Sequence, residues 1–485
     1  MTLAKKQIIG IGFIFHLLAA YFSVGYHQCD ELFQVFEFAG FKLGINKIEE
    51  MPWEFASQMR SGIEPLLVFS VTKAYHFFNN YNPFNVALFL RLIVAMASFL
   101  AVLKLISQLE EELINEKSRN YLWGFGLLFW CLPYFHVRLS SENFSSLFFI
   151  IGLTIVLQNL KQGKPSLSLL FAGFSFGLSF VCRFQFAFMI AGLFAWLMWV
   201  RKPVAKYYVK LVSGLFLALL VGMFVDQWLY GKWTLSWWNY LSENLFQNKA
   251  SRYGESPFYF YISEALLQLI PPFSIVLVIG IFGFWAKFQR HFLTWITIPF
   301  IVLHFFVAHK ELRFLFPILN FIPFMLILYL QTNQNNPNKF WQIIQSNMLM
   351  KTGVAVNLIL LCFFTFKPAD DTSKCLERIY NLVVGERAIL FYEGTKPYNN
   401  QASLNYFRNP TITLRDLNTE SAPISENENA YFFSEKFGES SRIEKNGRKF
   451  VRIYSYFPSW FAYLNFNGWL DRAYSFSIYK LEQDF

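Results

Sequence analysis

Apolar blocks recur along the first 366 residues of the chain, and each is about 20 residues long, the length of a helix that crosses a bilayer. Hydrophobic residues make up 55% of the 485 residues and charged residues only 15%, whereas a soluble domain carries about 25% charge. These observations exclude a soluble protein and predict an α-helical polytopic membrane protein. We place about eleven transmembrane helices near residues 8–26, 85–107, 122–137, 144–160, 167–184, 185–200, 209–228, 266–285, 292–308, 314–331 and 348–366.

Many of the basic residues fall in short loops on one side of the predicted membrane helices. The positive-inside rule assigns that side to the cytoplasm. This distribution accounts for the net charge of +10 without a nucleic-acid partner. The residues concerned are Lys5, Lys6, Lys161, Lys164, Arg201, Lys202, Lys206, Lys210, Lys287, Arg290, Lys339 and Lys351.

The opposite side, called the outer face below, receives the loops 27–84 and 229–265. An apolar stretch at 65–78 in the first loop is interrupted by Lys73 and His76. It is too short to span comfortably, so we predict a helix that lies at the membrane interface.

The chain changes character after residue 366, because charge rises and short β-rich runs alternate with turn signals. We therefore predict a transmembrane catalytic domain at 1–366 and a small soluble α/β domain at 367–485 on the outer face. The β-rich runs lie at 388–392, 430–433, 450–456 and 474–479.

Ionisable residues collect where the predicted helices reach the outer face. Charges at membrane depth or at helix ends are functional candidates by default, and the competing interpretation is a solvated rim. A site is favoured because separate helices deliver these groups to one level. They are His27, Asp30, Glu31 and Glu37 after the first helix, Arg138 after the third, Arg183 after the fifth, Asp226 in the seventh, and His309, Lys310, Glu311 and Arg313 after the ninth.

The two ends of this set suit different chemistry. A carboxylate such as Asp30 or Glu31 in a partly desolvated cleft can accept the proton of an attacking hydroxyl, although helix capping is an alternative role. The donors of His309, Lys310 and Arg313 suit an anionic leaving group such as a phosphate. Their alternative role is contact with lipid headgroups.

Several motifs are missing from the sequence. It contains no nucleotide-binding loop of the form GxxxxGK[ST] or GxGxxG, no HExxH, no GxSxG and no Asp-x-Asp pair. Its five cysteines form no CxxC pair and indicate neither a disulfide framework nor a zinc site. We therefore expect no cofactor and no metal.

Motifs along the whole chain resemble glycosyltransferase family 22, the multi-spanning mannosyltransferases that build lipid-linked oligosaccharides and GPI anchors. The most specific of them is HKELRF at 309–314, with Pro317 behind it. The others, in chain order, are HQCDELFQ at 27–34 with Glu37, Trp53-Glu54, Arg60-Ser61, the RLSS at 138–141, FVDQWLYGKWT at 224–234, Trp238-Asn239, Tyr253-Gly254, Phe457-Pro458 and the segment 469–479.

The resemblance implies a GT-C fold with interfacial helices in the first outer loop and a site that faces outward. It implies a polyprenyl-phosphate sugar donor, typically dolichyl-phosphate mannose, a lipid-linked glycan acceptor, and inversion at the anomeric carbon without a metal. Phe38 and Phe184 stand where the family often has proline, which leaves the acceptor open. Carried over by position, Asp30 is the general base beside Glu31, and His309, Lys310 and Arg313 hold the donor phosphate. His27, Glu37, Arg138, Arg183, Asp226 and Glu311 support them.

Other functional classes remain as alternatives. A lipid or glycolipid transporter or flippase would place polar, broken helices at the bilayer midplane, often in repeated halves. Here the charges lie at helix ends, the predicted spans are unbroken and no repeat is visible. A receptor-like protein would leave the charged helix ends unexplained. The Phe- and Asn-rich composition and the lack of a retrieval tail favour a bacterial plasma membrane over the endoplasmic reticulum, with the site on the periplasmic or lumenal face and membrane lipids around it.

Overall fold

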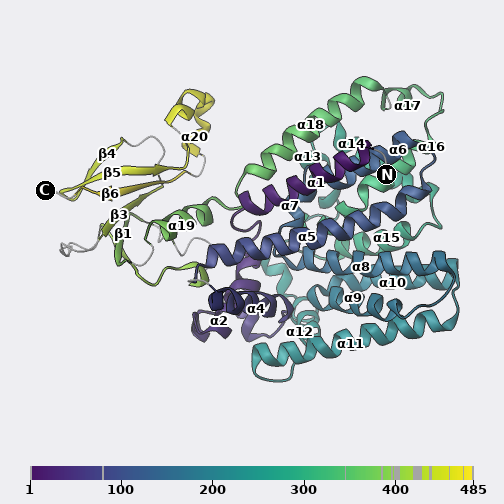
Figure 1. Ribbon diagram of the computed structural model, residues 1–485, viewed down its shortest axis with the longest axis horizontal. Helices are drawn as coiled ribbons and strands as arrows, with labels where there is room; N and C mark the ends of the chain where they lie inside the picture. The colour runs from purple at the N-terminus through teal and green to yellow at the C-terminus, as the bar shows by residue number, and fades with distance from the viewer. Residues whose placement is uncertain are drawn as a thin grey trace.

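The computed structural model describes residues 3–78, 81–344, 346–383, 386–394, 397, 405–418, 429–435, 440–457, 459–472 and 475–482. It consists of a bundle of helices with a small mixed sheet beyond one end of the bundle (Figure 1). The bundle contains α1 (Leu3–Phe22), α5 (Pro83–Leu109), α6 (Glu116–Leu128), α7 (Leu132–His136), α8 (Ser141–Gln162), α9 (Ser168–Cys182), α10 (Ala187–Trp196), α11 (Ala205–Tyr230), α13 (Phe260–Gln268), α14 (Phe273–Lys287), α15 (Phe292–Phe306), α16 (Ile322–Thr332), α17 (Lys339–Ile344) and α18 (Asn347–Phe366).

Fewer helices could each cross a membrane than the sequence predicts. By length and composition, six of the described helices qualify, or up to eight if each of two bent pairs is one span. Every predicted span overlaps a helix, but several of the spans expected to be unbroken are interrupted. Residues 129–131 separate α6 from α7 within the span predicted at 122–137, and the chain bends by 59° between the segment Leu312–Asn320 and α16 within the span predicted at 314–331. Proline marks the restart of the helix at both breaks, because Pro133 and Pro323 lie in the first turns of α7 and α16, where the missing N–H is least costly.

Small residues let α9 and α11 pack closely. A Cβ on Gly173 would lie 2.0 Å from the carbonyl oxygen of Leu211, and one on Gly214 would lie 2.0 Å from that of Leu170. Only glycine permits this approach of two backbones, which is a common device between helices in membranes.

The first outer loop folds into short helices at the sheet end of the bundle (Figure 1). The predicted interfacial helix is found as α4 (Ile63–Phe78), which packs against α2, α5 and α11 and ends in exposed Phe77 and Phe78. The remaining pieces are a π-helical turn at Leu32–Glu37, α2 (Phe38–Leu43) and α3 (Trp53–Ala56); the second outer loop contributes α12 (Ser236–Leu241).

The C-terminal unit is an α/β unit, as predicted. Its six strands follow the order β2-β1-β3-β6-β5-β4, with β1 parallel to both β2 and β3 and the other pairs antiparallel. The run at 388–392 coincides with β1, whereas β2 and β4 were not predicted, and Tyr474 of the last run lies outside the described residues. The elements are α19 (Asp371–Leu382), β1 (Ala388–Tyr392), β2 (Ile412–Asp416), β3 (Asn429–Ser434), β4 (Arg442–Lys445), β5 (Arg448–Ser455), α20 (Trp469–Arg472) and β6 (Ser477–Leu481).

The C-terminal unit is packed directly onto the first outer loop. One apolar cluster contains Val24 and Phe36 from the loop region together with Ile379 of α19 and Leu390 of β1. Because side chains alternate along a strand, Ile389 and Phe391 of β1 belong to a separate cluster on the other face of the sheet. The sheet therefore supports the loop that carries the candidate site residues.

Candidate active site

Asp30 and Arg313 meet at the sheet end of the bundle. Arg313 lies in the 3₁₀ segment Leu312–Asn320, and its Nη2 donates a hydrogen bond to Asp30 Oδ2 at 2.7 Å. Its Nε donates to Oε2 of Glu311, also at 2.7 Å. Burial alone would raise the pKa of Asp30, but the Arg313 guanidinium outweighs burial and holds this pKa below its ordinary value. Asp30 is therefore ionised at neutral pH.

Glu142 extends this ion pair into an alternating chain of charges. It lies in the first turn of α8, behind the N-cap residue Ser140, and its side chain is only 2% exposed. Its Oε1 is 2.9 Å from Arg183 Nη1 and 3.6 Å from Arg313 Nη1. Asp30, Arg313, Glu142 and Arg183 therefore stabilise one another where water is largely excluded.

Glu31 has a different environment from its neighbour Asp30. Its Oε1 accepts a hydrogen bond from the backbone N–H of His27 at 3.0 Å, and its Oε2 lies 4.0 Å from Arg138 Nη1. Burial raises the pKa of Glu31, against the opposing effect of Arg138. The two adjacent carboxyl groups are thus pushed toward different protonation states.

These groups line a polar cleft with an empty volume of about 490 Å³. Its walls come from the first outer loop, the start of α8, the end of α9, α12 and the Arg313 segment. Of the residues singled out from the sequence, the cleft brings together Asp30, Glu31, Arg183 and Arg313. The other lining residues are Gln34, Val35, Arg60, Ser61, Glu64, Ser140, Ser141, Glu142, Cys182, Phe184, Gln185 and Tyr240.

The structure places three other expected site residues outside the cleft lining. The amine of Lys310 donates to the carbonyl oxygens of Ser256 and Val307, at 2.9 and 2.7 Å. The imidazole of His309 lies 3.1 Å from Glu311 Oε1, and that of His27 lies 3.1 Å from the hydroxyl of Tyr134. Glu311 joins the site indirectly, through its bonds to Arg313.

Two further expected residues anchor the first outer loop. Asp226 accepts hydrogen bonds from the backbone N–H of Gly62 at 2.8 Å and from the hydroxyl of Ser236 at 2.6 Å. Glu37 accepts one from the backbone N–H of Tyr406 in the C-terminal unit at 3.1 Å. Both carboxyl groups are buried and lie outside the cleft lining, so they fix the loop that forms one wall of the cleft.

Residues 7–374 of this chain match the sequence model of the Alg9-like mannosyltransferase family, and this range contains every residue of the cleft. This chain belongs to the Alg9-like mannosyltransferase family.

Curated relatives of this family member are similar over part of their length. GPI mannosyltransferase 3 of Candida albicans is 25% identical over 322 residues, which cover 65% of this chain and 62% of the relative. GPI alpha-1,2-mannosyltransferase 3 of Bos taurus is 25% identical over 276 residues, 56% of this chain and 49% of the relative. Among solved structures, ArnT from Cupriavidus metallidurans bound to undecaprenyl phosphate is 10% identical, covers 88% of this chain and 92% of that chain, and has a TM-score of 0.48.

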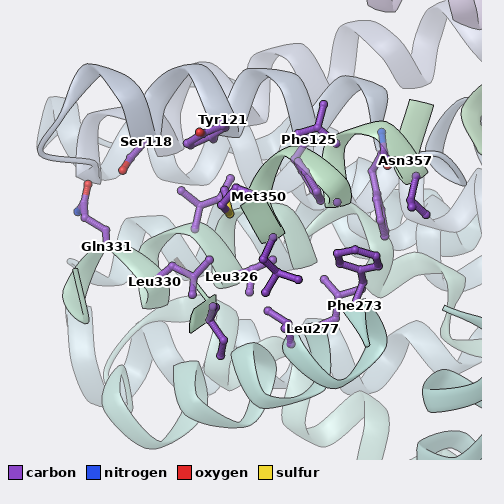
Figure 2. Close-up of a pocket in the computed structure, with 18 of the residues that line it drawn as sticks. Ser118, Tyr121, Phe125, Phe273, Leu277, Leu326, Leu330, Gln331, Met350 and Asn357 are labelled. Carbon is purple, nitrogen blue, oxygen red and sulfur yellow. The ribbon is translucent and has the colours of Figure 1, made fainter. Parts of the chain in front are cut away.

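This Alg9-like chain has a larger cavity away from the polar cleft (Figure 2). It has an empty volume of about 1310 Å³ and is lined mainly by apolar side chains of α6, α14, α16 and α18. Figure 2 shows Ser118 and Gln331 at one end of it and Phe273 and Asn357 toward the other. Lys117 is the one charged residue among its described lining residues, so the groups suited to acid–base chemistry lie in the polar cleft instead.

Sequence reasoning counted Glu142 among the ionisable residues at the outer helix ends without giving it a role, and it missed Glu64 as a cleft residue. Glu142 has a weak signal, because it follows the RLSS motif at 138–141, but an acidic residue in the first turn of a helix usually only complements the helix dipole. No motif or spacing in the sequence points to Glu64 as a cleft residue. It lines the cleft because α4 begins there and Glu64 lies in its first turn.

Proposed function

We propose that this protein is a membrane mannosyltransferase that transfers a sugar from a polyprenyl-phosphate-linked donor to a hydroxyl of a lipid-linked glycan acceptor, with inversion. The observation that carries this proposal is the ionised Asp30 held by Arg313 in a polar cleft, in a chain of the Alg9-like family. A glycosyl transfer of this kind needs a base for the acceptor and cations for the departing phosphate.

Asp30 is the proposed general base. Within the described part of the chain, the Asp30 carboxylate accepts a hydrogen bond from Arg313 through Oδ2 and none through Oδ1. Asp30 Oδ1 therefore remains for the acceptor hydroxyl. The hydroxyl oxygen attacks the anomeric carbon from the face opposite the phosphate, its proton passes to Asp30, and the bond from the anomeric carbon to the phosphate oxygen breaks. The bonding electron pair leaves with polyprenyl phosphate. Glu31 is the weaker candidate, because both of its oxygens already face His27 N–H and Arg138.

Arg313 and Arg183 are the proposed partners of the donor phosphate, with His309 and Lys310 on the same connection as Arg313. Arg313 and Arg183 share Glu142, which keeps their guanidinium groups oriented toward one cleft when no donor is bound. Two cations at that point offset the charge that develops on the leaving oxygen. Lys310 takes part only if its amine leaves the carbonyl oxygens of Ser256 and Val307.

The location is part of the proposal. The alternation of basic loops places the cleft on the periplasmic or lumenal face. The composition favours a bacterial plasma membrane, but the curated relatives from Candida albicans and Bos taurus lend that preference no support.

The test is a transfer assay with purified protein in lipid vesicles. The donor is polyprenyl-phosphate mannose, and the acceptors are a panel of lipid-linked glycans and long-chain alkyl mannosides. Asp30→Asn keeps the shape of the side chain but cannot accept the proton, so turnover should fall by about 10²–10⁴, while donor binding stays near the wild-type value.

Glu31→Gln is the matched control for Asp30→Asn, since it changes the adjacent carboxyl in the same way. It should retain far more turnover than Asp30→Asn. Near-normal turnover of Asp30→Asn would remove Asp30 from the role of base. Movement of intact donor lipid across the vesicle membrane, with no sugar transferred to any acceptor, would instead support the transporter alternative.

A further inference from the structure

Part of the cleft lining has no role in the transfer proposed above. This part, called the α4 wall, consists of Arg60, Glu64, Gln185 and Tyr240. Glu64 lies in the first turn of α4, Arg60 lies in the loop before it, and Tyr240 belongs to α12. Glu142 and Arg313, which were placed above in the chain of charges, lie on other elements, α8 and the segment Leu312–Asn320.

Glu64 is a buried carboxyl group with an unmet hydrogen bond. The residue is 4% exposed, and its Oε1 has no hydrogen-bond partner among the described residues. The carboxyl group is hydrogen-bonded by the Cys182 side chain of α9. Leaving a buried acceptor unsatisfied is costly, and here it lines a cleft, where a ligand can supply the missing donor.

Arg60 offers a complementary donor beside Glu64. Its Nη2 is fixed by Glu54 Oε1 at 2.6 Å, whereas its buried Nε has no hydrogen-bond partner among the described residues. The guanidinium group lies 5.3 Å from the centre of the Tyr240 ring, and the Tyr240 hydroxyl accepts from Gln185 at 2.7 Å. The α4 wall is therefore held in place before any ligand binds.

The positive charge of Arg60, in the α4 wall, also acts on Asp30, the proposed base. Arg60 stabilises the ionised form of Asp30 and acts on the carboxyl of Glu64 as well, so both carboxyl groups lie within its electrostatic reach. Burial raises the pKa of Glu64 to about 8, which favours a neutral carboxyl that can donate as well as accept. A neutral, bifunctional group in the same wall as an aromatic ring suits a sugar hydroxyl rather than a phosphate.

We propose that Arg60 and Glu64, beside the ring of Tyr240, bind hydroxyl groups on the acceptor's sugar and hold it so that its reacting hydroxyl faces Asp30. This inference rests on the proposed function, because it assigns the acceptor to one wall of the cleft and the donor phosphate to Arg313 and Arg183. A hydroxyl can donate to Glu64 Oε1 and accept from Arg60 Nε, and neither of these atoms has a hydrogen-bond partner among the described residues.

The experiment measures KM for each substrate separately, with polyprenyl-phosphate mannose as donor and a long-chain alkyl α-mannoside as acceptor. Glu64→Leu removes both hydrogen-bonding oxygens at similar size, and we expect KM for the acceptor to rise roughly tenfold and KM for the donor to change by less than about twofold. Glu64→Gln keeps an acceptor and a donor and should restore most of the affinity for the alkyl mannoside.

Two controls separate recognition from folding. Thr72→Val changes a buried residue further along α4 that bonds Tyr406 and lies outside the cleft lining, so a disturbed α4 would show in this variant too. Monodeoxy analogues of the alkyl mannoside add a second control: the analogue without the recognised hydroxyl should lose affinity for the wild type but no further affinity for Glu64→Leu.

The outcomes are distinct. A wild-type protein that transfers sugar, with an acceptor KM unchanged in Glu64→Leu, would overturn the inference and leave the proposed function standing. Equal rises in the donor and acceptor KM, or a matching loss in Thr72→Val, would make Glu64 a merely structural residue. A wild-type protein that transfers no sugar to any acceptor would overturn the proposed function and this inference with it.

Discussion

At the scale of single residues, the buried carboxyl groups of the first outer loop differ in what their surroundings do to them. Asp30 has an arginine at hydrogen-bond distance and is ionised. Among the described residues, Glu37 has only neutral neighbours at that distance, the amide of Asn46 and the backbone N–H of Tyr406. Burial therefore dominates and raises the pKa of Glu37 to about 8. The first carboxyl group suits chemistry, and the second suits a neutral contact between loop and sheet.

The raised pKa of Glu37 makes the stability of the fold depend on pH. Below the ordinary pKa of a glutamate, both the folded and unfolded states hold the proton, and no difference arises. Between that value and about pH 8, the unfolded chain ionises while the folded chain keeps its proton, so this group lowers the stability as pH rises. We expect Glu37→Gln to remove this part of the slope.

The measurement is the thermal unfolding midpoint of both proteins in detergent, from pH 5 to pH 8. The glutamine can bond Tyr406 N–H and, after a rotation of the Asn46 amide, also Asn46 Oδ1, which has no partner among the described residues. Parallel pH profiles for the wild type and Glu37→Gln would contradict the assignment of a neutral Glu37.

Residue types were easier to predict than residue positions. The sequence led to Asp30, Arg183 and Arg313, because an ionisable residue at a helix end already indicates a site. It also treated Lys310 and Arg313 as neighbours on one helix end. In the structure α15 ends at Phe306 and the next helical segment begins at Leu312, so Lys310 lies in a non-helical connection and Arg313 lies in the following 3₁₀ segment, and the two side chains bond different groups. No periodicity argument applies to such a connection.

At the scale of elements, Arg138 joins the end of α1 to the start of α8. Its Nη2 donates to the carbonyl oxygen and the hydroxyl of Ser23, both at 2.7 Å, and its Nη1 donates to the carbonyl oxygen of Gly25 at 3.2 Å. A cation at the C-terminal end of a helix also complements the helix dipole. These bonds set where the chain leaves α1 and, through that, where Asp30 lies.

Arg138→Lys should therefore misplace Asp30 as well as weaken the fold. A single amine cannot reach both Ser23 and Gly25, and a buried carbonyl oxygen left unsatisfied costs about 1–3 kcal/mol. We expect a lower unfolding midpoint and a loss of turnover of about tenfold, measured by thermal unfolding and the transfer assay. Arg119→Lys, at an exposed arginine that bonds the Leu113 carbonyl oxygen, is the control and should change neither. Equal values for the two variants would contradict this role for Arg138.

Asp226 makes the corresponding link between α11 and the start of α4. Asp226→Ala should leave Gly62 N–H and the Ser236 hydroxyl without their acceptor and cost about 1–3 kcal/mol for each. Asp226→Asn keeps one acceptor oxygen for Gly62, and its amide can donate to the Ser236 hydroxyl, so its effect should be much smaller. Hydrogen exchange at Gly62 distinguishes the two, with fast exchange expected in the alanine variant alone. Fast exchange in neither variant would show that Asp226 does not hold this loop.

At the scale of the whole molecule, the arrangement of the chain could be predicted further than its site. Helix-length apolar blocks and the change of composition after residue 366 were enough for a helical bundle followed by a small α/β unit. The packing of that unit onto the first outer loop could not be predicted, because Val24, Phe36, Ile379 and Leu390 look like separate local cores in the sequence. Their contact depends on long-range packing, which hydrophobic patterns do not encode.

The structure gives the predicted orientation a sharper test. Figure 1 shows the N-terminus and α17 at the end of the bundle away from the sheet. If the basic loops face the cytoplasm, the sheet and the polar cleft lie outside. Tyr463 in the C-terminal unit is 86% exposed, and Lys164 is exposed in the turn between α8 and α9. Cysteines introduced at these positions, with the exposed Cys362 and the half-buried Cys29 both replaced by serine, should therefore react differently with a membrane-impermeant maleimide.

In intact cells or sealed vesicles of the native orientation, Tyr463→Cys should be labelled, and Lys164→Cys should be labelled only after the membrane is opened. Both residues are exposed on the protein, so a difference before opening reports the membrane and not the fold. Opening the membrane also serves as the control, because it should bring the two positions to similar labelling. Labelling of Lys164→Cys alone in sealed vesicles would show that the orientation in the membrane is the reverse of the predicted one. The cleft would then face the cytoplasm, and a sugar donor presented on the outer leaflet could not reach Asp30.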